Sequence, residues 1–339
     1  MTRTKRGLWR AVLLGLIAAG CWLAALIIAG DLAEQYGGLS VRFAKAAVTQ
    51  KDLERAQSES TSEELVLRAA WTRKKELQTL CSELGGSAKA RVIGIYGDSR
   101  QIAPLSLLSG GFLPEKDEEG CVLDAVSAWA LFHSSDAVGA TLKLNGRVYV
   151  VRGIVKSYEP MLIIRDDTLK YENLEFGVSD PAVGKQEAET FFARCGAGGE
   201  YLVVQSGLYV RLILGFVCLA AGGFLLAGAA ALLKSAWLKK DYSCTRLLFL
   251  TAGIALAAAA VLLFIKTFYW PQSFLPTRWS DFAFWRGLIE SWQADWKAIS
   301  LMTPLPKEIQ LFRSLRCCFV LLLVSVLTGG WCCAFVRRR

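Results

Sequence analysis

The sequence has little of what catalytic and metal sites are made from. Its 339 residues include one histidine, His133. A lone imidazole cannot build a His-rich metal site, and no set of partner residues indicates a Ser-His-Asp or Cys-His arrangement around it. The chain also lacks a G-x-x-x-x-G-K-[ST] motif, which excludes a P-loop ATPase. We therefore expect a protein that is not an enzyme, with no cofactor and no metal.

Four long stretches of the chain contain no charged residue. A helix rises about 1.5 Å per residue, so about 20 apolar residues cross a hydrocarbon core of about 30 Å. Each stretch has that length, and the first exceeds the apolar run of a signal peptide, about 7–15 residues, so we interpret it as an uncleaved anchor. An ion-coupled carrier usually has an ionisable residue within its transmembrane helices. These four stretches have none, which argues against that class of transporter. The four predicted transmembrane helices are Ala11 to Gly30, Leu212 to Leu233, Leu247 to Ile265 and Cys317 to Val336.

Basic residues flank these helices on one predicted side. The N-terminus, the short second loop and the C-terminus are all basic, which favours the cytoplasm for the three segments and for both termini. Asp31 to Ser206 and Thr267 to Ser314 are then extracytoplasmic. The formal net charge of +9 suits anionic lipid headgroups, and no basic run with interleaved aromatics indicates nucleic-acid binding. The basic residues are Arg3, Lys5, Arg6, Arg10, Lys234, Lys239, Lys240, Arg246, Arg337, Arg338 and Arg339.

The large segment after the first helix has the pattern of an α+β domain. Thr49 and Asp52 form a capping-box pattern at the start of a helix. Lys74 to Leu84 predicts a second helix, ended by Gly85-Gly86, and Arg91 to Tyr96 predicts a strand. A mixed sheet with short helices on it is the expected fold.

The strongest local pattern lies further on. Cys121 to Asp124 predicts a strand, and Ala125 to Phe132 predicts a helix. Asn145-Gly146 separates two alternating runs, Thr141 to Leu144 and Arg147 to Val155, and indicates a hairpin with a type I′ turn.

This order of motifs resembles the extracytoplasmic core domain of MacB-type ABC permeases. The arrangement of one helix, a large outer domain and three more helices is also similar to that family and to the related FtsX and lipoprotein-releasing permeases. In the family a glycine commonly follows the Leu-Phe pair, whereas this chain has His133 there. The resemblance is carried by Gly111, Pro114, Val122, Asp124, Ala130, Leu131, Phe132, Val138, Gly139, Gly146, Tyr149, Val151, Gly153 and Val155.

The resemblance implies a permease-like subunit of the cell membrane that couples a separate cytoplasmic ATPase to the outer domain, for export or mechanotransmission, as a homodimer or hetero-oligomer. The second loop, Lys234 to Arg246, is short for the coupling helix of that family. The alternative is a non-transporting binding or structural protein that has kept the outer domain and lost the ATPase contact. The candidate ATPase contact is Lys234, Trp237, Lys239 and Lys240.

Three cysteines fall in the extracytoplasmic part, Cys81, Cys121 and Cys195. Three thiols allow one disulfide at most. Cys121 begins the strand that the resembled family buries, so the pairing we expect is Cys81 with Cys195, with three reduced thiols as the alternative.

An aromatic-rich segment separates the third helix from the fourth. Phe274 to Ile299 predicts an amphipathic helix capped by Ser280, with aromatic residues at three- and four-residue steps. Tryptophan suits the headgroup level of a membrane, so we expect this helix to lie on the outer membrane surface. The alternative is packing beneath the outer domain. The interfacial aromatics are Trp279, Phe282, Trp285, Trp292 and Trp296.

The expected domain organisation follows from these boundaries. The parts are residues 1–30 (N-terminus and first transmembrane helix), 31–206 (MacB-like core domain), 207–266 (second and third transmembrane helices), 267–316 (aromatic segment) and 317–339 (fourth transmembrane helix and basic C-terminus).

Overall fold

The computed structural model divides the chain into two compact units. One unit contains Met1–Gly37, Gly207–Phe274 and Glu308–Arg339, and the other contains Gly38–Ser206 and Leu275–Lys307. The structure describes residues 3–45, 47–59, 65–83, 85–103, 105–157, 159–166, 168–181, 183–196, 199–238, 244–267, 275–276, 278–301 and 304–337.

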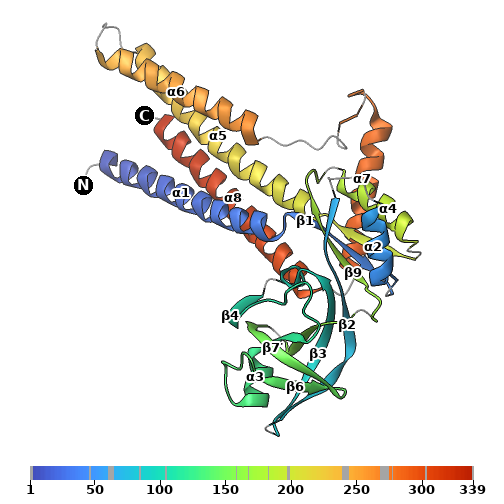
Figure 1. Cartoon of the computed structure of the whole chain (residues 1–339). Helices are drawn as coiled ribbons and strands as arrows, with labels where there is room; N and C mark the ends of the chain where they lie inside the picture. The colour runs from blue at the N-terminus through green and yellow to red at the C-terminus, as the bar shows by residue number, and fades with distance from the viewer. Residues whose placement is uncertain are drawn as a thin grey trace. The chain divides into compact units, whose positions relative to one another are not determined.

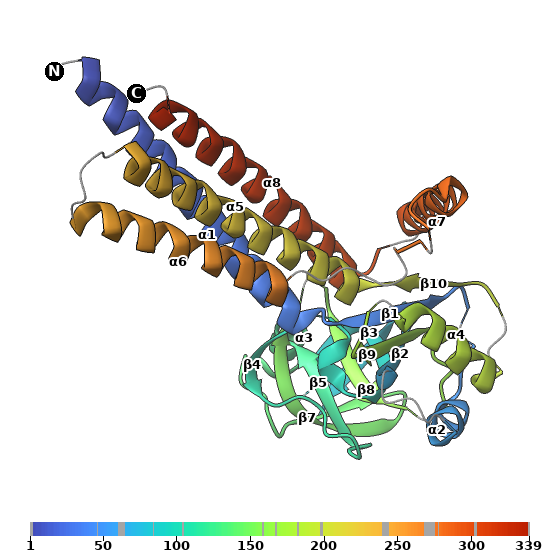
Figure 2. The same cartoon turned by 90° about the horizontal axis from the view of Figure 1, so that it is seen from above.

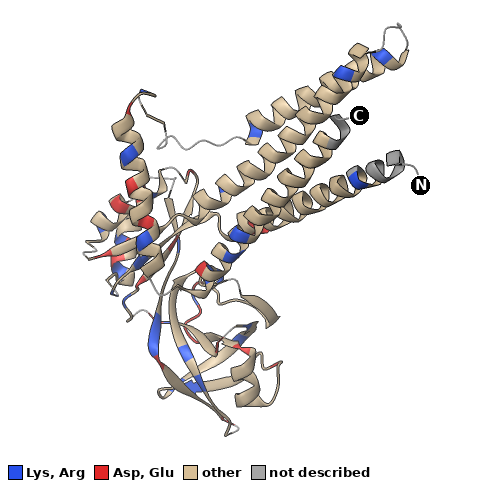
Figure 3. Ribbon diagram, turned by 180° about the vertical axis from the view of Figure 1, so that it is seen from behind, with Lys and Arg blue, Asp and Glu red and all other residues tan. Residues whose placement is uncertain are grey.

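Four long helices supply most of the first unit, and Figures 1 and 2 show them side by side. They are α1 (Arg3–Gln35), α5 (Ser206–Leu238), α6 (Cys244–Thr267) and α8 (Pro306–Arg337). Each contains a segment long and apolar enough to span a membrane. Lysine and arginine lie near the helix ends, and the middle of each helix is free of charge (Figure 3). The described helices therefore agree with the four predicted spans, and the chain is a multi-pass membrane protein.

Small residues let α1 and α8 approach closely. Ala25 and Ala29 of α1 are fully buried, and Cys318 of α8 is buried in the same cluster. The Ser325 hydroxyl of α8 donates a hydrogen bond to the Ala18 carbonyl of α1 at 2.8 Å. Small side chains and interhelical hydrogen bonds are the usual means of helix association in lipid, where burial of apolar surface gains nothing.

The second unit is a ten-stranded mixed sheet with short helices. Neighbouring strands run in the order β10-β1-β9-β2-β3-β8-β5-β7-β4, and β6 pairs with β2 and β7. The pairs β3–β8 and β5–β7 are parallel, and the other pairs are antiparallel. The strands are β1 (Gly38–Phe43), β2 (Leu65–Ser82), β3 (Ser87–Gly97), β4 (Ser106–Gly110), β5 (Gly120–Asp124), β6 (Thr141–Leu144), β7 (Arg147–Lys156), β8 (Met161–Arg165), β9 (Asn173–Val178) and β10 (Tyr201–Val204).

Helices cover this sheet at two places, each over its own hydrophobic cluster. α2 (Gln50–Ser58) and α4 (Gly184–Cys195) lie side by side (Figure 1). Their side chains pack with those of β1 and β9. α3 (Ala125–Phe132) packs over β2, β3, β5 and β7. A one-turn 3-10 helix, η1 (Ser99–Gln101), follows β3, and α7 (Phe282–Leu301) completes the unit. The strands between α1 and α5 in the chain thus form an α+β domain, called here the sheet domain.

The helix predicted for Lys74 to Leu84 is wrong. β2 continues without interruption to Ser82 and pairs with β3 along most of its length, with Leu80 opposite Ala88. Leu77, Leu80 and Cys81 have helical spacing, but pairing with β3 satisfies the backbone of this segment, and tertiary context overrides so weak a local preference. Residue 84 lies outside the described residues.

Other local predictions are confirmed. Thr49 and Asp52 form both hydrogen bonds of a capping box at the start of α2. The Asp124 carboxylate caps α3, whose bounds are those expected from the sequence. His133 ends α3 in the left-handed conformation, with φ of 54°. That conformation explains why the resembled family has a glycine there, because glycine adopts it without steric cost.

The hairpin turn is also confirmed, and it gives a prediction. Asn145 and Gly146 both have positive φ, 49° and 85°, as a type I′ turn requires. Gly146→Val should destabilise the sheet domain by more than about 1 kcal/mol, because a β-branched residue resists that conformation. Urea unfolding of the full chain measures the loss, and an unchanged midpoint would contradict the turn.

Candidate functional site

The most unusual site in the sheet domain is a carboxylate in the middle of the sheet. Glu175 lies on β9, between the buried apolar residues Leu174 and Phe176. It is paired directly opposite Ser40 of β1. Because side chains two residues apart share a face of a strand, Arg42 of β1 lies on the same face as Ser40.

Four donors converge on the two oxygen atoms of this carboxylate. Oε1 accepts from Nη1 of Arg42 at 2.8 Å and from the indole N–H of Trp71 at 3.4 Å. Oε2 accepts from the Ser40 hydroxyl at 2.5 Å and from Nζ of Lys307 at 2.8 Å. A carboxylate offers about four lone-pair sites, so the hydrogen-bonding capacity of Glu175 is filled.

All the members of this ion cluster are buried. Glu175 is 3% exposed, Arg42 5% and Lys307 8%. Burial by itself would raise the pKa of the Glu175 carboxyl group. The positive charges of Lys307 and Arg42 and their hydrogen bonds outweigh burial and lower the pKa to about 2. The carboxylate is therefore charged at every physiological pH. The Arg42 guanidinium also lies over the Trp71 ring, 5.3 Å from its centroid.

Lys307 brings a long helix into the cluster. It is the second residue of α8, and its ammonium group also donates to the Gln101 carbonyl at 2.9 Å. A positive charge in the first turn of a helix is unfavourable next to the helix dipole. The bonds to Glu175 and Gln101 offset that cost and hold Lys307, a residue of the second unit, beside β9.

Two other long helices connect directly to neighbouring strands. α1 ends at Gln35 and β1 begins at Gly38, while β10 ends at Val204 and α5 begins at Ser206. The Ser206 hydroxyl donates to the Gly38 carbonyl at 2.8 Å. Since β10, β1 and β9 are adjacent in the sheet, three consecutive strands are each attached to the end of one long helix.

This ion cluster was not predicted, although the sequence contains two signals of it. Glu175 interrupts an apolar strand, and Lys307 follows Pro306 at a helix start where a carboxylate is preferred. Each signal alone is weak, and only the fold brings residues 132 positions apart into contact.

The aromatic segment forms α7, with its bounds shifted from the prediction. The Asp281 carboxylate accepts hydrogen bonds from the backbone N–H groups of Ala283 and Phe284, so Asp281 caps the helix instead of Ser280. Residue 274 lies outside the described residues. Lys185 of α4 forms an ion pair with Asp295 of α7 at 3.6 Å.

Phe282, Trp292 and Trp296 of α7 are exposed, Phe284 and Trp285 are half-buried, and no residue of the helix is fully buried. Trp279 stacks on Trp285 with ring centroids 6.3 Å apart. The interfacial helix and the alternative, packing beneath the outer domain, both stay predictions. The exposed fractions of the aromatic side chains are 72% for Trp279, 79% for Phe282, 44% for Trp292 and 51% for Trp296.

Membrane binding by α7 stays a prediction. A peptide covering Trp279 to Leu301 should become helical and shift its fluorescence to the blue when lipid vesicles are added. The same peptide with its four tryptophans changed to serine is the control for helix formation, measured by circular dichroism because it has no indole fluorescence. It keeps the charges, loses the tryptophan rings and should stay unstructured with lipid. No response of the native peptide to lipid would contradict an interfacial helix.

The predicted cysteine pair is not bonded in this structure. Cys81 is exposed on β2, whereas Cys195 is buried at the end of α4 beside Phe191 and Phe192. Burial raises the pKa of the Cys195 thiol to about 12, which makes it unreactive at neutral pH. The disulfide stays a prediction.

The predicted ATPase contact falls near the end of α5. Lys234 is exposed, and Trp237 is 83% exposed. Lys239 and Lys240 lie outside the described residues. A large exposed indole next to a lysine, at the end of an apolar helix, is available to a partner or to lipid headgroups.

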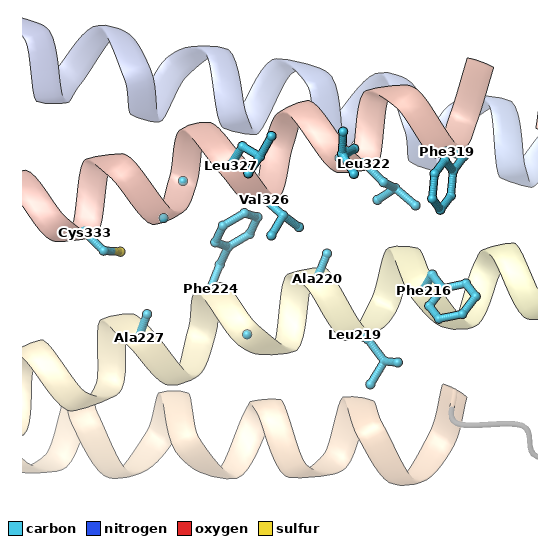
Figure 4. A pocket seen from close by; sticks show the side chains of 14 residues that line it. Phe216, Leu219, Ala220, Phe224, Ala227, Phe319, Leu322, Val326, Leu327 and Cys333 are labelled. Atoms are coloured by element: carbon cyan, nitrogen blue, oxygen red, sulfur yellow. The ribbon is translucent and has the colours of Figure 1, made fainter. Parts of the chain in front are cut away.

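An apolar groove of about 640 Å³ lies between α5 and α8. Phe224 points from α5 toward Val326 and Leu327 of α8 (Figure 4). Gly329 makes room for that ring, because a Cβ at this position would collide with it. Gly223 also lines the groove, and because it has no side chain it leaves the groove open at that position. These residues lie within two of the predicted transmembrane segments, Leu212 to Leu233 and Cys317 to Val336.

Comparison with known proteins gives structural likenesses only. No family model matches the chain, and no curated protein matches it. The periplasmic region of MacB from Actinobacillus actinomycetemcomitans is similar, with 17% identity and a TM-score of 0.43, over 53% of this chain and 93% of that one. The extracellular domain of the noncanonic ABC-type transporter YknZ from Gram-positive bacteria has 14% identity and a TM-score of 0.39, over 49% and 99%. A domain of a protein described as a permease from Porphyromonas gingivalis has 12% identity and a TM-score of 0.35, over 50% and 89%.

Proposed function

We propose that this chain is the permease-like membrane subunit of an ABC transporter of the MacB/FtsX type. A separate cytoplasmic ATPase drives it, and the sheet domain lies on the extracytoplasmic side. The observation that carries the proposal is the layout: a sheet domain between the first and second of four spanning helices, with the motif order of that family in its strands. Export or mechanotransmission is its task, and it acts as a dimer or hetero-oligomer.

The proposed mechanism is mechanical. Three adjacent strands, β10, β1 and β9, are attached to the ends of α5, α1 and α8. If a cytoplasmic partner changes the spacing of these helices, the change would therefore displace the strands at one edge of the sheet. The Lys307–Glu175 ion pair is the only one of the three attachments made by side chains alone. It gives α8 a connection that the order of the chain does not provide.

The orientation behind this mechanism can be tested by cysteine labelling. With the native cysteines replaced, a cysteine at an exposed position near Asp117 should react with an impermeant maleimide added to intact cells. A cysteine at Lys239 should react only after the membrane is opened. This result follows from span length and from basic loops facing the cytoplasm. Labelling of both positions from the same side would contradict four spans with cytoplasmic termini.

Co-purification tests the proposed function itself. The full chain, isolated in mild detergent from its native host, should carry a nucleotide-binding subunit that hydrolyses ATP. Lys234→Ala with Trp237→Ala should release that subunit, because both side chains are exposed beyond the apolar part of α5. Trp129→Ala is the matched control, since Trp129 is 58% exposed on α3 of the sheet domain.

A second candidate function rests on the same region. α5 ends at Leu238 and α6 begins at Cys244, which leaves residues 239–243 between them. So short a connection favours a binding or structural membrane protein that has lost the ATPase contact. Isolation of the chain with no ATPase, under conditions that preserve known transporter complexes, would support this second function and exclude the first.

A further inference from the structure

A pocket of about 350 Å³ lies at the carboxyl ends of the parallel strands β3 and β8. Ile95 and Tyr96 of β3 form part of its wall, and Arg165 is the last residue of β8. Its size is at the lower end of the range for small-molecule sites, about 300–1,000 Å³. None of the features assigned above uses this pocket.

Six charged side chains line the pocket, three of each sign, and they are kept apart. Among the described residues, ion pairs form elsewhere, for example between Arg152 and Asp117, and none joins two of these six. Separated charges around one cavity suit a ligand that carries both signs. The six are Lys116, Arg147, Arg165, Glu115, Glu118 and Asp166.

Arg165 is the best-positioned of the six. It is 7% exposed, and its guanidinium is fixed by two backbone carbonyls, Nε with Pro114 at 2.7 Å and Nη2 with Gly97 at 2.9 Å. No described residue accepts a hydrogen bond from its Nη1 atom. A guanidinium carries five N–H donors, so three remain, in the fork geometry that matches a carboxylate. Burial lowers the pKa of Arg165, and a bound anion would offset that cost.

The rim of the pocket provides the opposite charge. Glu115 and Glu118 are exposed on the loop before β5, and Asp166 follows Arg165. Arg147 is held away from these carboxylates, because its Nη2 donates to the Glu118 carbonyl at 3.2 Å and its guanidinium lies over the Tyr149 ring. Oδ1 of Asp166 accepts hydrogen bonds from the Thr168 hydroxyl at 2.5 Å and from the Thr168 backbone N–H at 3.2 Å. No described residue donates to Oδ2 of Asp166 or to the carboxylates of Glu115 and Glu118, so these oxygen atoms can receive an ammonium group.

We infer that this pocket binds a small zwitterion, a free amino acid or a short peptide, with its carboxylate on Arg165 and its ammonium group among Glu115, Glu118 and Asp166. The inference does not depend on an ATPase partner, so it stands or falls separately from the proposed function.

The test is a thermal-shift and calorimetric screen of the full chain in detergent. The probes are the twenty free amino acids and dialanine, each at millimolar concentration. At least one should bind, and its N-acetylated form and its amide should each bind at least tenfold more weakly, since each removes one of the two charges. The inference would be overturned if none of the probes binds, or if the N-acetylated and amide forms bind as tightly as the free amino acid.

Variants locate the binding site. Arg165→Lys should weaken binding at least tenfold, because lysine keeps the charge and loses the fork. Arg194→Lys, on α4 and outside the pocket, is the matched control and should bind like the native chain. The double variant Glu115→Gln with Glu118→Gln changes only exposed side chains, so it tests the rim even if Arg165→Lys fails to fold. Native affinity in the double variant and in a folded Arg165→Lys would show that the pocket is not the site.

Discussion

Glu175→Gln is expected to destabilise the sheet domain by about 3–5 kcal/mol, the usual cost of removing one partner of a buried ion pair. The substitution keeps the shape of the side chain and removes its charge. Arg42 and Lys307 then remain buried, 5% and 8% exposed, without the carboxylate that compensates them. Urea unfolding of the detergent-solubilised chain, followed by near-ultraviolet circular dichroism, measures the loss.

Glu189→Gln provides the comparison. Glu189 is exposed on α4, and its replacement by glutamine should change the free energy of unfolding by no more than about 0.5 kcal/mol. If the two variants unfold at the same urea concentration, the ion cluster does not stabilise the domain and the proposed attachment of α8 fails with it.

The same cluster predicts a dependence on pH. The pKa of Glu175 is about 2 in the folded chain, below the value of about 4.3 for glutamate in an unfolded chain. Its contribution to stability is therefore complete above pH about 4.3 and is lost as the pH falls toward 2. The native chain should lose more stability over this interval than the Glu175→Gln variant, whose amide does not titrate.

Gly153→Ala is expected to have the second largest effect, a loss of about 3 kcal/mol, at the upper end of the range for overpacking a core. Gly153 lies on β7, and a Cβ there would collide with the Gly111 carbonyl oxygen and approach the Gly111 carbonyl carbon to 3.0 Å. These are backbone atoms, which cannot rotate away as a side chain can. The chain at Gly111, just after β4, would have to separate from β7. Urea unfolding again gives the magnitude.

Gly139→Ala separates steric collision from backbone strain. Gly139 has φ of 86°, but a Cβ there meets no atom within 4 Å. Its replacement should cost only the strain of the left-handed conformation, about 1–2 kcal/mol. If the two substitutions lower the free energy of unfolding equally, the backbone at Gly111 can move away from the new Cβ and the collision adds no cost.

The sequence could predict elements whose causes are local. Span length and the absence of charge identify the four long helices, because a hydrocarbon core imposes both. The turn at Asn145-Gly146 and the capping box of Thr49 and Asp52 depend on residues close together in the chain, and both are found. The segment after Lys74 was mistaken for a helix because its partner strand, β3, decides its structure.

The ion cluster could not be predicted from the sequence, because its members come together only when distant segments pack. Lys307 and Glu175 are unremarkable in sequence, and each is a charged residue of the kind found on any surface. They become important because the fold buries both side chains at one point. There each charge has lost its water and is stabilised by the other. The charges around Arg165 are likewise scattered over several segments until β3 and β8 pair in parallel.

By itself, the sequence determined that this protein spans a membrane, and it determined the hairpin and helix caps of an α+β domain, because apolar length and turn chemistry act over a few neighbouring residues. The tertiary structure alone decided the course of β2, the attachment of Lys307 to β9 and the grouping of six charges around one pocket. Each of these depends on contacts between segments distant in sequence, where burial and pairing set the energy and the local pattern does not.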